Sequence, residues 1–385
     1  VTGVQTCALP ISKSGRGEKP QVEMWGEYGS RGTRQAAGNV RGQVGAFYGS
    51  ITLQNKNTDG YNIARTGAER DDHRARTLTG KFGIDFNEYF NVEGTVRQVD
   101  RAVQYDQEQF PPTDPPVFDS FAYDKFYNTS GRVAGTVKLF DQRWVQRVSW
   151  SLLRDNYDSD FGFGPAFIFR TFGRRERTDY RTSYTFDTPV LGNARHTISG
   201  QIDSEREHFD NSLGADKARS RKGAAGEYLV DLANGLTLSG AYRKDWNEQF
   251  ADAETWRATV NQRFASTGTR LHASAGTGVT NPSFTEQYGG GFNFVGNPAL
   301  TPEKSFGWDA GIEQRFWDGR ATIDVTYFAS DVTDQIVPGT SGGGLPTAVN
   351  APGVSLRKGV EVSTKVRSEE HTSELQSPYV ISYAV

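Results

Sequence analysis

Aromatic side chains gather in two stretches of the chain and are the residues best suited to hold a ligand. The first stretch contributes Phe163 and Phe167, and the second contributes Phe284, Tyr288, Phe292 and Phe294. Aromatic rings offer a large apolar contact area, and several rings that converge can bind a small organic ligand. The same rings could instead pack one loop against another, so both interpretations stay open for each of them.

Acidic side chains in further polar stretches could supply oxygen ligands to calcium, which prefers carboxylates. These acids are Asp71, Asp72, Asp106, Glu108, Asp114, Asp119 and Asp124. They lack the regular ligand spacing of a dedicated calcium loop, and a solvated polar loop is the simpler explanation. We therefore predict no metal centre and keep loop-bound calcium as the alternative.

The histidines and the overall charge argue against catalysis and against nucleic-acid binding. His73, His196, His208 and His272 lie in no metalloprotease or nucleophile-elbow motif. The chain carries 43 basic and 46 acidic residues, a net charge of −3, whereas a general nucleic-acid surface is strongly basic. We predict that the chain is not an enzyme and has no nucleic-acid partner.

The elements that must position these residues are β-strands, because apolar and polar side chains alternate with period 2 along most of the chain. In one run the apolar face carries Ala321, Ile323, Val325 and Tyr327, and the polar face carries Thr322, Asp324 and Thr326. About sixteen such runs recur, with no helix of ordinary length. The predicted fold is all-β and antiparallel.

The connections and faces of these strands predict a membrane barrel. Short turns rich in aromatic residues alternate with long polar loops near 64–75, 106–128, 158–175, 282–304 and 338–355, as in outer-membrane barrels. A barrel of about sixteen strands encloses a lumen too wide for side chains to fill. The charged face must therefore meet water inside, and the apolar face must meet lipid outside.

Both ends of the chain read as translated sequencing-adapter sequence. Residues 367–377 (RSEEHTSELQS) back-translate to one strand of a common adapter, and residues 1–11 (VTGVQTCALPI) back-translate to the opposite strand. We set aside 1–11 and 367–385 from fold reasoning. The only cysteine, Cys7, falls in the first segment, so no disulfide is expected in residues 12–366.

One motif, GNPALTPEKS, resembles the signature of TonB-dependent outer-membrane receptors, most closely their cobalamin-receptor and siderophore-receptor branch. Further matches are the TDGY sequence at 58–61 and DVTDQI at 331–336, in the order that the family shows. The motif residues are Gly296, Asn297, Pro298, Leu300, Pro302, Glu303, Lys304 and Ser305. In the family this pattern ends an outer loop and leads into a barrel strand.

The resemblance implies a transmembrane antiparallel barrel of about 22 strands, filled by a plug domain. Residues 12–19 resemble the end of the plug, and residues 20–366 are then an incomplete barrel of about 16 strands that does not function alone. It also implies a Gram-negative outer membrane as the location, outer-membrane lipid and the TonB–ExbB–ExbD complex as partners, and a ferric siderophore or cobalamin as the ligand. A passive porin, or a surface or sensor receptor that transports nothing, is the alternative.

Overall fold

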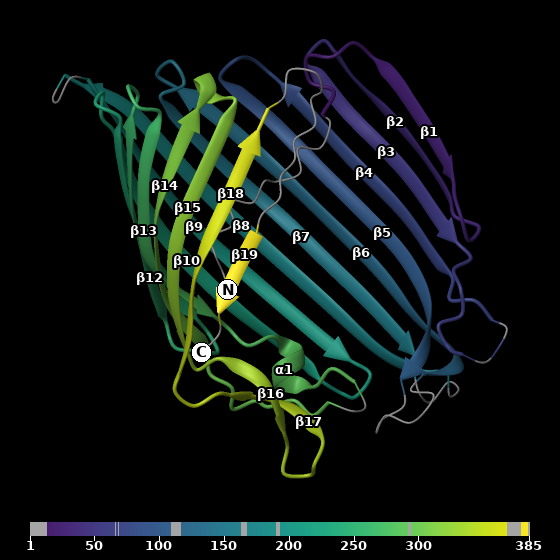
Figure 1. Ribbon diagram of the computed structural model, residues 1–385. Helices are drawn as coiled ribbons and strands as arrows, with labels where there is room; N and C mark the ends of the chain where they lie inside the picture. The colour runs from purple at the N-terminus through teal and green to yellow at the C-terminus, as the bar shows by residue number, and fades with distance from the viewer. Residues whose placement is uncertain are drawn as a thin grey trace.

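A computed structural model describes residues 14–65, 67, 69–108, 117–162, 168–189, 193–291, 294–367 and 379–383. The strands form one curved wall (Figure 1). Its first half comprises β1 (Gln21–Tyr28), β2 (Arg34–Val44), β3 (Phe47–Thr58), β4 (His73–Asp85), β5 (Phe90–Glu108), β6 (Val117–Leu139), β7 (Trp144–Asp160), β8 (Ile168–Thr188) and β9 (Ala194–Asn211). Its second half comprises β10 (Asp216–Asp231), β11 (Leu236–Asn247), β12 (Ala253–Phe264), β13 (Thr269–Thr280), β14 (Glu303–Phe316), β15 (Ala321–Thr333), β18 (Val354–Val366) and β19 (Tyr379–Tyr383).

Each strand from β1 to β14 pairs antiparallel with the next strand in the sequence, and β15 pairs with β18. The sheet has seventeen strands. Sixteen remain when β19, which lies in the segment predicted to be adapter, is left out. Within the described residues no register joins β1 to β18 or β19, so the wall has two free edges (Figure 1). The prediction of an incomplete, all-β antiparallel barrel wall is confirmed.

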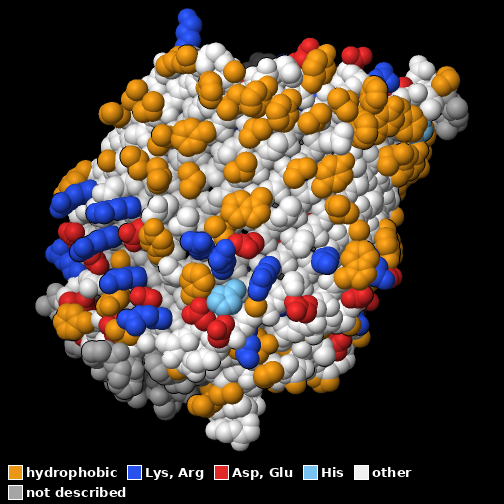
Figure 2. Space-filling view, turned by 180° about the vertical axis from the view of Figure 1, so that it is seen from behind, with side chains coloured by type: hydrophobic (Ala, Val, Ile, Leu, Met, Phe, Trp, Pro, Cys, Tyr) orange, Lys and Arg blue, Asp and Glu red, His pale blue; other side chains and the backbone are white. Residues whose placement is uncertain are grey.

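The predicted division into two faces is also present. Val325 and Tyr327 lie on one face with Trp308, and the rings of Trp308 and Tyr327 are 5.4 Å apart. These side chains are each about 40% exposed although they are large and apolar: Trp308 42%, Val325 38% and Tyr327 39%. The neighbouring Asp309 and Asp324 point to the other face. Seen from behind, the outside of the wall is dominated by hydrophobic side chains over much of its height (Figure 2).

The predicted short turns occur where expected, and aromatic stacking closes them. Phe86 stacks on Phe90 at 5.0 Å, and Phe140 stacks on Trp144 at 6.0 Å. Phe140 also adopts a φ of 51°, a left-handed conformation that a tight reversal can require. These turns gather at one end of the wall.

The residue ranges predicted for the long loops include residues that belong to strands. Strand β6 already begins at Val117 and β7 continues to Asp160, so much of 106–128 and the start of 158–175 are paired strand. The reason is that backbone hydrogen bonds of the ladder continue past the apolar band, where the polar composition resembles that of a loop. The span 338–355 likewise contains the hairpin β16 (Ile336–Thr340) and β17 (Pro346–Asn350).

Among the described residues the helical elements are α1 (Phe284–Tyr288) and the 3₁₀ turn η2 (Trp317–Gly319). In the part of the chain that the structure describes, neither helix has the length or the apolar character needed to cross a membrane. Helix α1 and the β16–β17 hairpin lie together at the end of the wall opposite the short turns (Figure 1).

Candidate ligand-binding site at the outer end of the barrel

Helix α1 is a short, tightly capped element. The Ser283 hydroxyl accepts a hydrogen bond from the Glu286 backbone N–H at 3.2 Å, and the Glu286 carboxylate accepts one from the Ser283 N–H at 2.7 Å. This reciprocal arrangement satisfies two of the free N–H groups at the helix start. Pro282 is buried and Gln287 is only 1% exposed, so the helix is seated firmly against the wall.

Phe284 packs within the protein. Its ring stacks on Phe209 of β9 at 5.5 Å with an interplanar angle of 7°, and the Arg219 guanidinium carbon lies 4.3 Å from its centroid. Arg219 also donates a hydrogen bond to the Pro282 carbonyl at 2.8 Å. Of the two interpretations open for this ring, the contacts support loop packing.

Tyr288 belongs to the same aromatic cluster and is half-buried. Its ring is 6.2 Å from that of Phe284, and its hydroxyl accepts a hydrogen bond from Gln249 at 2.8 Å. The Lys217 ammonium lies 5.3 Å above the ring. A ligand contact of Tyr288 stays a prediction.

The other predicted aromatic contacts give less information. Phe294 is half-buried and forms an isolated β-bridge with Gly291. Phe163, Phe167 and Phe292 lie outside the described residues. A ligand contact of these four side chains therefore stays a prediction.

The first half of the family motif holds α1 and the β16–β17 hairpin together. A Cβ at Gly296 would lie 2.4 Å from the Gly289 nitrogen and 2.5 Å from the Tyr288 Cα, so only glycine fits. The Asn297 side chain donates to the Ala348 carbonyl at 2.9 Å, and its backbone N–H donates to the Glu286 carbonyl at 2.8 Å. Leu300 is 4% exposed and Pro298 is exposed.

The second half of the motif starts strand β14. The Glu303 carboxylate accepts a hydrogen bond from the Ile336 N–H at 2.6 Å, and the Ser305 hydroxyl donates to the Gly278 carbonyl at 3.5 Å. Pro302 is half-buried and Lys304 is exposed. These contacts are structural, and they fix where the hairpin leaves the wall.

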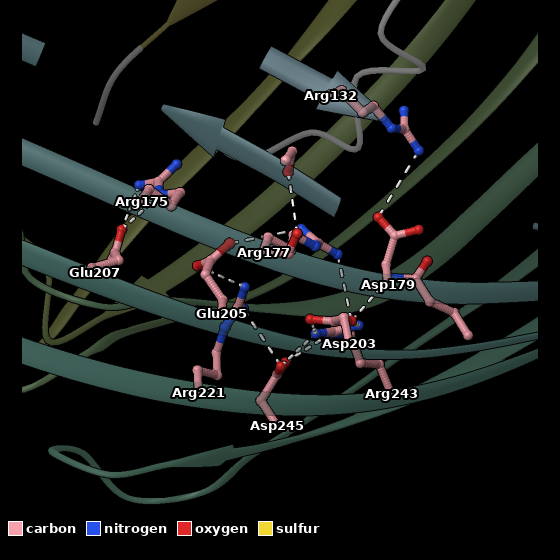
Figure 3. Close-up of polar contacts among 12 residues, drawn as sticks. Arg132, Arg175, Arg177, Asp179, Asp203, Glu205, Glu207, Arg221, Arg243 and Asp245 are labelled. Atoms are coloured by element: carbon pink, nitrogen blue, oxygen red, sulfur yellow. Dashed lines mark hydrogen bonds and ion pairs between the residues drawn. The ribbon is translucent and has the colours of Figure 1, made fainter. Parts of the chain in front are cut away.

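The inner face of the wall next to α1 carries a ladder of ion pairs in two groups (Figure 3). Asp203 has a fully buried side chain and accepts hydrogen bonds from Arg243 at 2.9 and 3.3 Å. Arg177 lies 3.4 Å from the same carboxylate, and Asp245 pairs with Arg243 at 2.6 Å. Carboxylates buried in this way need several cationic donors around them.

A second, separate group of ion pairs lies next to the aromatic cluster. The first network ends where Arg221 donates to Glu205 at 3.2 Å, whereas Glu207 lies 2.6 Å from Arg175 and 2.7 Å from Arg219. Because Arg219 also contacts Phe284, this second group joins the wall to α1. Sequence reasoning identified the charged face but not these ion pairs, since their members come from four strands.

A recess of about 380 Å³ is lined by charged residues of the ladder and by the ends of neighbouring strands and loops. Its charged lining consists of four arginines and two glutamates, a net charge of +2, together with polar and aromatic groups such as Gln249 and Phe250. The charged lining residues are Arg175, Arg177, Arg219, Arg221, Glu205 and Glu207. The recess can therefore favour an anionic group beside an apolar one.

The structure also brings together some of the acids considered for calcium. Ligand oxygens of Glu69, Asp71 and Asp106 lie within 4.8 Å of one another. Asp106 is buried and accepts hydrogen bonds from the Ala64 and Ser120 N–H groups, both at 2.9 Å. One oxygen of Glu69 and one of Asp71 are buried and have no hydrogen-bond partner among the described residues. Oxygen ligands of this kind fit a divalent cation.

The remaining candidate acids are placed differently. Asp119 accepts a hydrogen bond from Asn62 at 2.6 Å and lies close enough to act on the pKa of Glu69 and Asp71. Asp72 pairs with Arg74 at 2.8 Å. Asp124 has one buried oxygen without a hydrogen-bond partner among the described residues. Asp114 and the Glu108 side chain lie outside the described residues.

Burial and mutual repulsion raise the pKa of two carboxyls of the cluster, Glu69 and Asp71. Burial first, and then the neighbouring Asp71 and Asp106 carboxylates, raise the pKa of Glu69 to about 7. Burial also raises the pKa of Asp71, although a hydrogen bond from the Ile63 N–H opposes this effect. Sequence reasoning missed Glu69, because only the fold brings Asp106 next to it.

Comparison with known proteins agrees with this architecture. A family model described as TonB dependent receptor-like, beta-barrel, matches residues 19–384. Among solved structures, the siderophore receptor PirA from Acinetobacter baumannii is similar with a TM-score of 0.73 at 13% identity, covering 94% of this chain and 62% of that one.

Two further structures show the same fold. The hemophore receptor HasR of Serratia marcescens, solved with its hemophore HasA and heme, has a TM-score of 0.71 at 14% identity, covering 94% of this chain and 63% of that one. The ferric-catecholate import receptor Fiu from E. coli K12 has a TM-score of 0.70 at 10% identity, covering 96% and 66%. The chain thus spans 62–66% of the length of these three structures.

Proposed function

The chain belongs to the TonB-dependent receptor family, and from this premise we propose that its parent receptor imports a scarce ligand across the outer membrane of a Gram-negative bacterium. The family consists of transport receptors and not of enzymes, in agreement with the sequence prediction. In this proposal the wall described above surrounds a plug domain, and ligand binding at the outer loops and plug precedes release to the inside.

The observation that carries the proposal furthest is the charge of the recess beneath α1. Four arginines against two glutamates favour an anionic ligand, and the adjoining aromatic cluster favours one with planar apolar parts. Ferric catecholates and related ferric siderophores combine a net negative charge with aromatic rings. We therefore favour a ferric siderophore over cobalamin, whose corrin ring lacks such a charge.

Energy for release would come from the TonB–ExbB–ExbD complex acting on the plug. A passive porin would need neither that complex nor a loop motif that fixes α1 above the lumen. A sensor receptor would bind the same ligand without importing it. Energy-dependent uptake of radiolabelled ligand separates the three, because a porin transports without TonB and a sensor does not transport.

The charge argument is tested by binding to the full-length receptor in detergent. The probes are ferric enterobactin as an anionic catecholate and cyanocobalamin, and the readout is quenching of tryptophan fluorescence. Arg175→Gln removes one cation from the recess, where Glu207 keeps Arg219 as a partner. Loss of one charge-assisted contact should weaken binding of the catecholate about tenfold.

Arg315→Gln is a matched control at the opposite end of the barrel. Arg315 and Arg175 have similarly exposed side chains, 55% and 53%, and each pairs with a glutamate that keeps a second arginine. We expect this variant to bind as the wild type does. Equal weakening in both variants, or preferential binding of cyanocobalamin, would contradict the proposed ligand class.

A further inference from the structure

The segment before β1, residues 14–20, is bound to the inner face of the wall. The Arg16 guanidinium donates hydrogen bonds to both oxygens of the Asp85 carboxylate, at 2.8 and 2.5 Å. The pairing registers from β9 back to β4 place Asp85 on the same inner face as Asp203. The Arg16 guanidinium carbon also lies 5.3 Å from the centroid of the Tyr48 ring. A two-point ion pair of this kind fixes the direction of a side chain as well as its distance.

Gly15 brings the backbone of this segment into direct contact with β2 and β3. Gly15 is buried and has a φ of 72°. A Cβ at this position would lie 2.2 Å from the Gly49 carbonyl oxygen and 2.5 Å from the Gly42 nitrogen. The conformation and the lack of space therefore both require glycine. Since Gly42 and Gly49 are cross-strand partners, the segment packs on the backbone of the sheet itself.

Strand β2 holds the same segment through Gln43. The Gln43 side-chain oxygen accepts a hydrogen bond from the Gly17 N–H at 2.6 Å, and the Gln43 backbone N–H donates to the Glu18 carbonyl at 2.8 Å. The Glu18 carboxylate accepts a further hydrogen bond from Arg41 at 2.8 Å. Three strands, β2, β3 and β4, thus contact four successive residues of the segment. We call these contacts the junction anchor, which comprises Gly15, Arg16, Gly17 and Glu18 with their partners Arg41, Gln43, Tyr48 and Asp85.

The wall beneath the junction anchor is itself well supported. Tyr48 is only 4% exposed, and its ring covers Gly83, where a Cβ would lie 2.2 Å from the Tyr48 Cζ. The Tyr48 hydroxyl donates to the Glu93 carboxylate at 3.5 Å. Glu93 also pairs with Lys81 at 2.9 Å and lies 3.6 Å from Arg147. The ring that Arg16 contacts is therefore fixed by residues of β4, β5 and β7.

The position of the junction anchor decides which contacts bear a force along the chain. The first register pair between β1 and β2 is Gln21 with Arg41, and these two strands lie at the edge of the wall (Figure 1). A pull on the chain before Gly15 reaches residues 15–18 of the anchor before it reaches this pair. Without the anchor, the force would act directly on the hydrogen bonds between β1 and β2.

We propose that the junction anchor fixes the end of the plug to the barrel during import and so confines the movement of the plug to residues before Gly15. This inference rests on the proposed function, because it requires a plug that precedes the barrel and is pulled. The anchor combines a two-point ion pair to β4 with backbone contacts to β2 and β3, and all of these must break before β1 bears the force. The barrel strands therefore keep their pairing while the plug changes shape.

The test is single-molecule force spectroscopy on the full-length receptor in a lipid bilayer, pulled through a tag at the N-terminus of the plug. In the wild type we expect the length of released chain to end with the plug. Arg16→Gln removes the cation of the two-point ion pair, and Asp85→Asn removes its carboxylate. In both variants β1 and β2 should follow the plug and release residues 15–44, about 100 Å of additional extended chain.

Arg143→Gln is the matched control. Arg143 lies at the same end of the wall, is 3.5 Å from Asp187 and has a similarly exposed side chain, 53% against 47% for Arg16. This variant should release no more chain than the wild type, and far-ultraviolet circular dichroism checks that every variant contains the same β-structure. The additional release in the wild type or the control, or its absence from both anchor variants, would overturn the proposal. Uptake of ligand is measured separately, so a receptor that keeps its barrel strands under force but imports nothing contradicts only the proposed function.

Discussion

The acid cluster of Glu69, Asp71 and Asp106 leads to a prediction about pH. The folded protein holds a proton on Glu69 more tightly than the unfolded chain does, because its pKa rises from an ordinary 4.5 to about 7. A raised carboxyl pKa stabilises the fold fully below pH 4.5, and this stabilisation is lost as the pH rises through 7. The shift corresponds to at most about 3 kcal/mol, and partial solvent exposure reduces it to about 1–2 kcal/mol.

The perturbation is Glu69→Gln, which keeps the shape of the side chain and removes its titration. In the presence of EGTA, the hydrogen-exchange protection factors of residues 59–65 and 69–72 in the wild type, corrected for the intrinsic pH dependence of exchange, should fall between pH 5 and 7. In Glu69→Gln this pH dependence should be smaller, because the variant has no titrating carboxyl at position 69. Asp59→Asn alters an exposed acid of the same loop, with 51% of its side chain accessible, and should behave as the wild type.

Calcium provides the second half of this prediction. Binding must displace the proton from Glu69, so the apparent affinity of the wild type should fall about tenfold for each pH unit below 7. The variant should bind more weakly above pH 7 and show a flatter dependence below it. Isothermal titration in two buffers of different ionisation enthalpy measures the released proton. Protection factors that do not vary with pH, or an unchanged slope in Glu69→Gln, would refute the reasoning.

Three further predictions concern the loop motif and the two faces of the wall. Gly296→Ala should displace α1 and speed hydrogen exchange over 282–288, whereas Gly342→Ala, whose Cβ would meet no atom within 4 Å, should not; equal exchange in both would contradict the close approach. Val325→Arg places a charge on the lipid face and should lower the free energy of unfolding in urea by about 2–4 kcal/mol if the residue lies near the bilayer midplane. Thr326→Arg on the lumen face should lower it far less, and equal losses in the two variants would contradict the assignment of faces. Asp203→Asn removes the buried carboxylate that Arg243 and Arg177 share, which leaves Arg243 only Asp245 and Arg177 only Glu205, and it should lower the free energy of unfolding by about 2–4 kcal/mol in the same assay; an unchanged unfolding midpoint would show that this carboxylate adds no stability.

The wall could be predicted because one of its faces meets lipid and the other meets water. Apolar and polar side chains therefore alternate along each strand, and each strand shows this alternation by itself. The alternation around Val325 needs no information from distant residues, and the aromatic turns at Phe86 and Phe140 are equally local. The loop bounds were wrong for a physical reason. Beyond the apolar band, strands such as β6 stay paired although both faces meet water, so their composition no longer distinguishes strand from loop.

The site could be predicted only in part, because its contacts join distant segments. Phe284 looks like a ligand contact in the sequence, yet its ring stacks on Phe209 of another strand. Glu69 was missed because Asp106, which acts on its pKa, lies on β5. Motif residues such as Gly296 could be recognised by resemblance, whereas the close backbone approach that requires glycine is visible only in the fold.

The pairing of each strand with its neighbour in the sequence bears on how such a wall can change over evolution. Among the described strands of the wall, β1 to β15 and β18, each pairs only with its neighbours along the chain, so a hairpin can be gained or lost by a short in-frame insertion or deletion without changing the other pairings. Between β15 and β18 the chain forms the separate hairpin β16–β17, and the pairing of β15 with β18 continues the wall. The outer loops can therefore change in sequence and length while the strands of the wall keep their pairing.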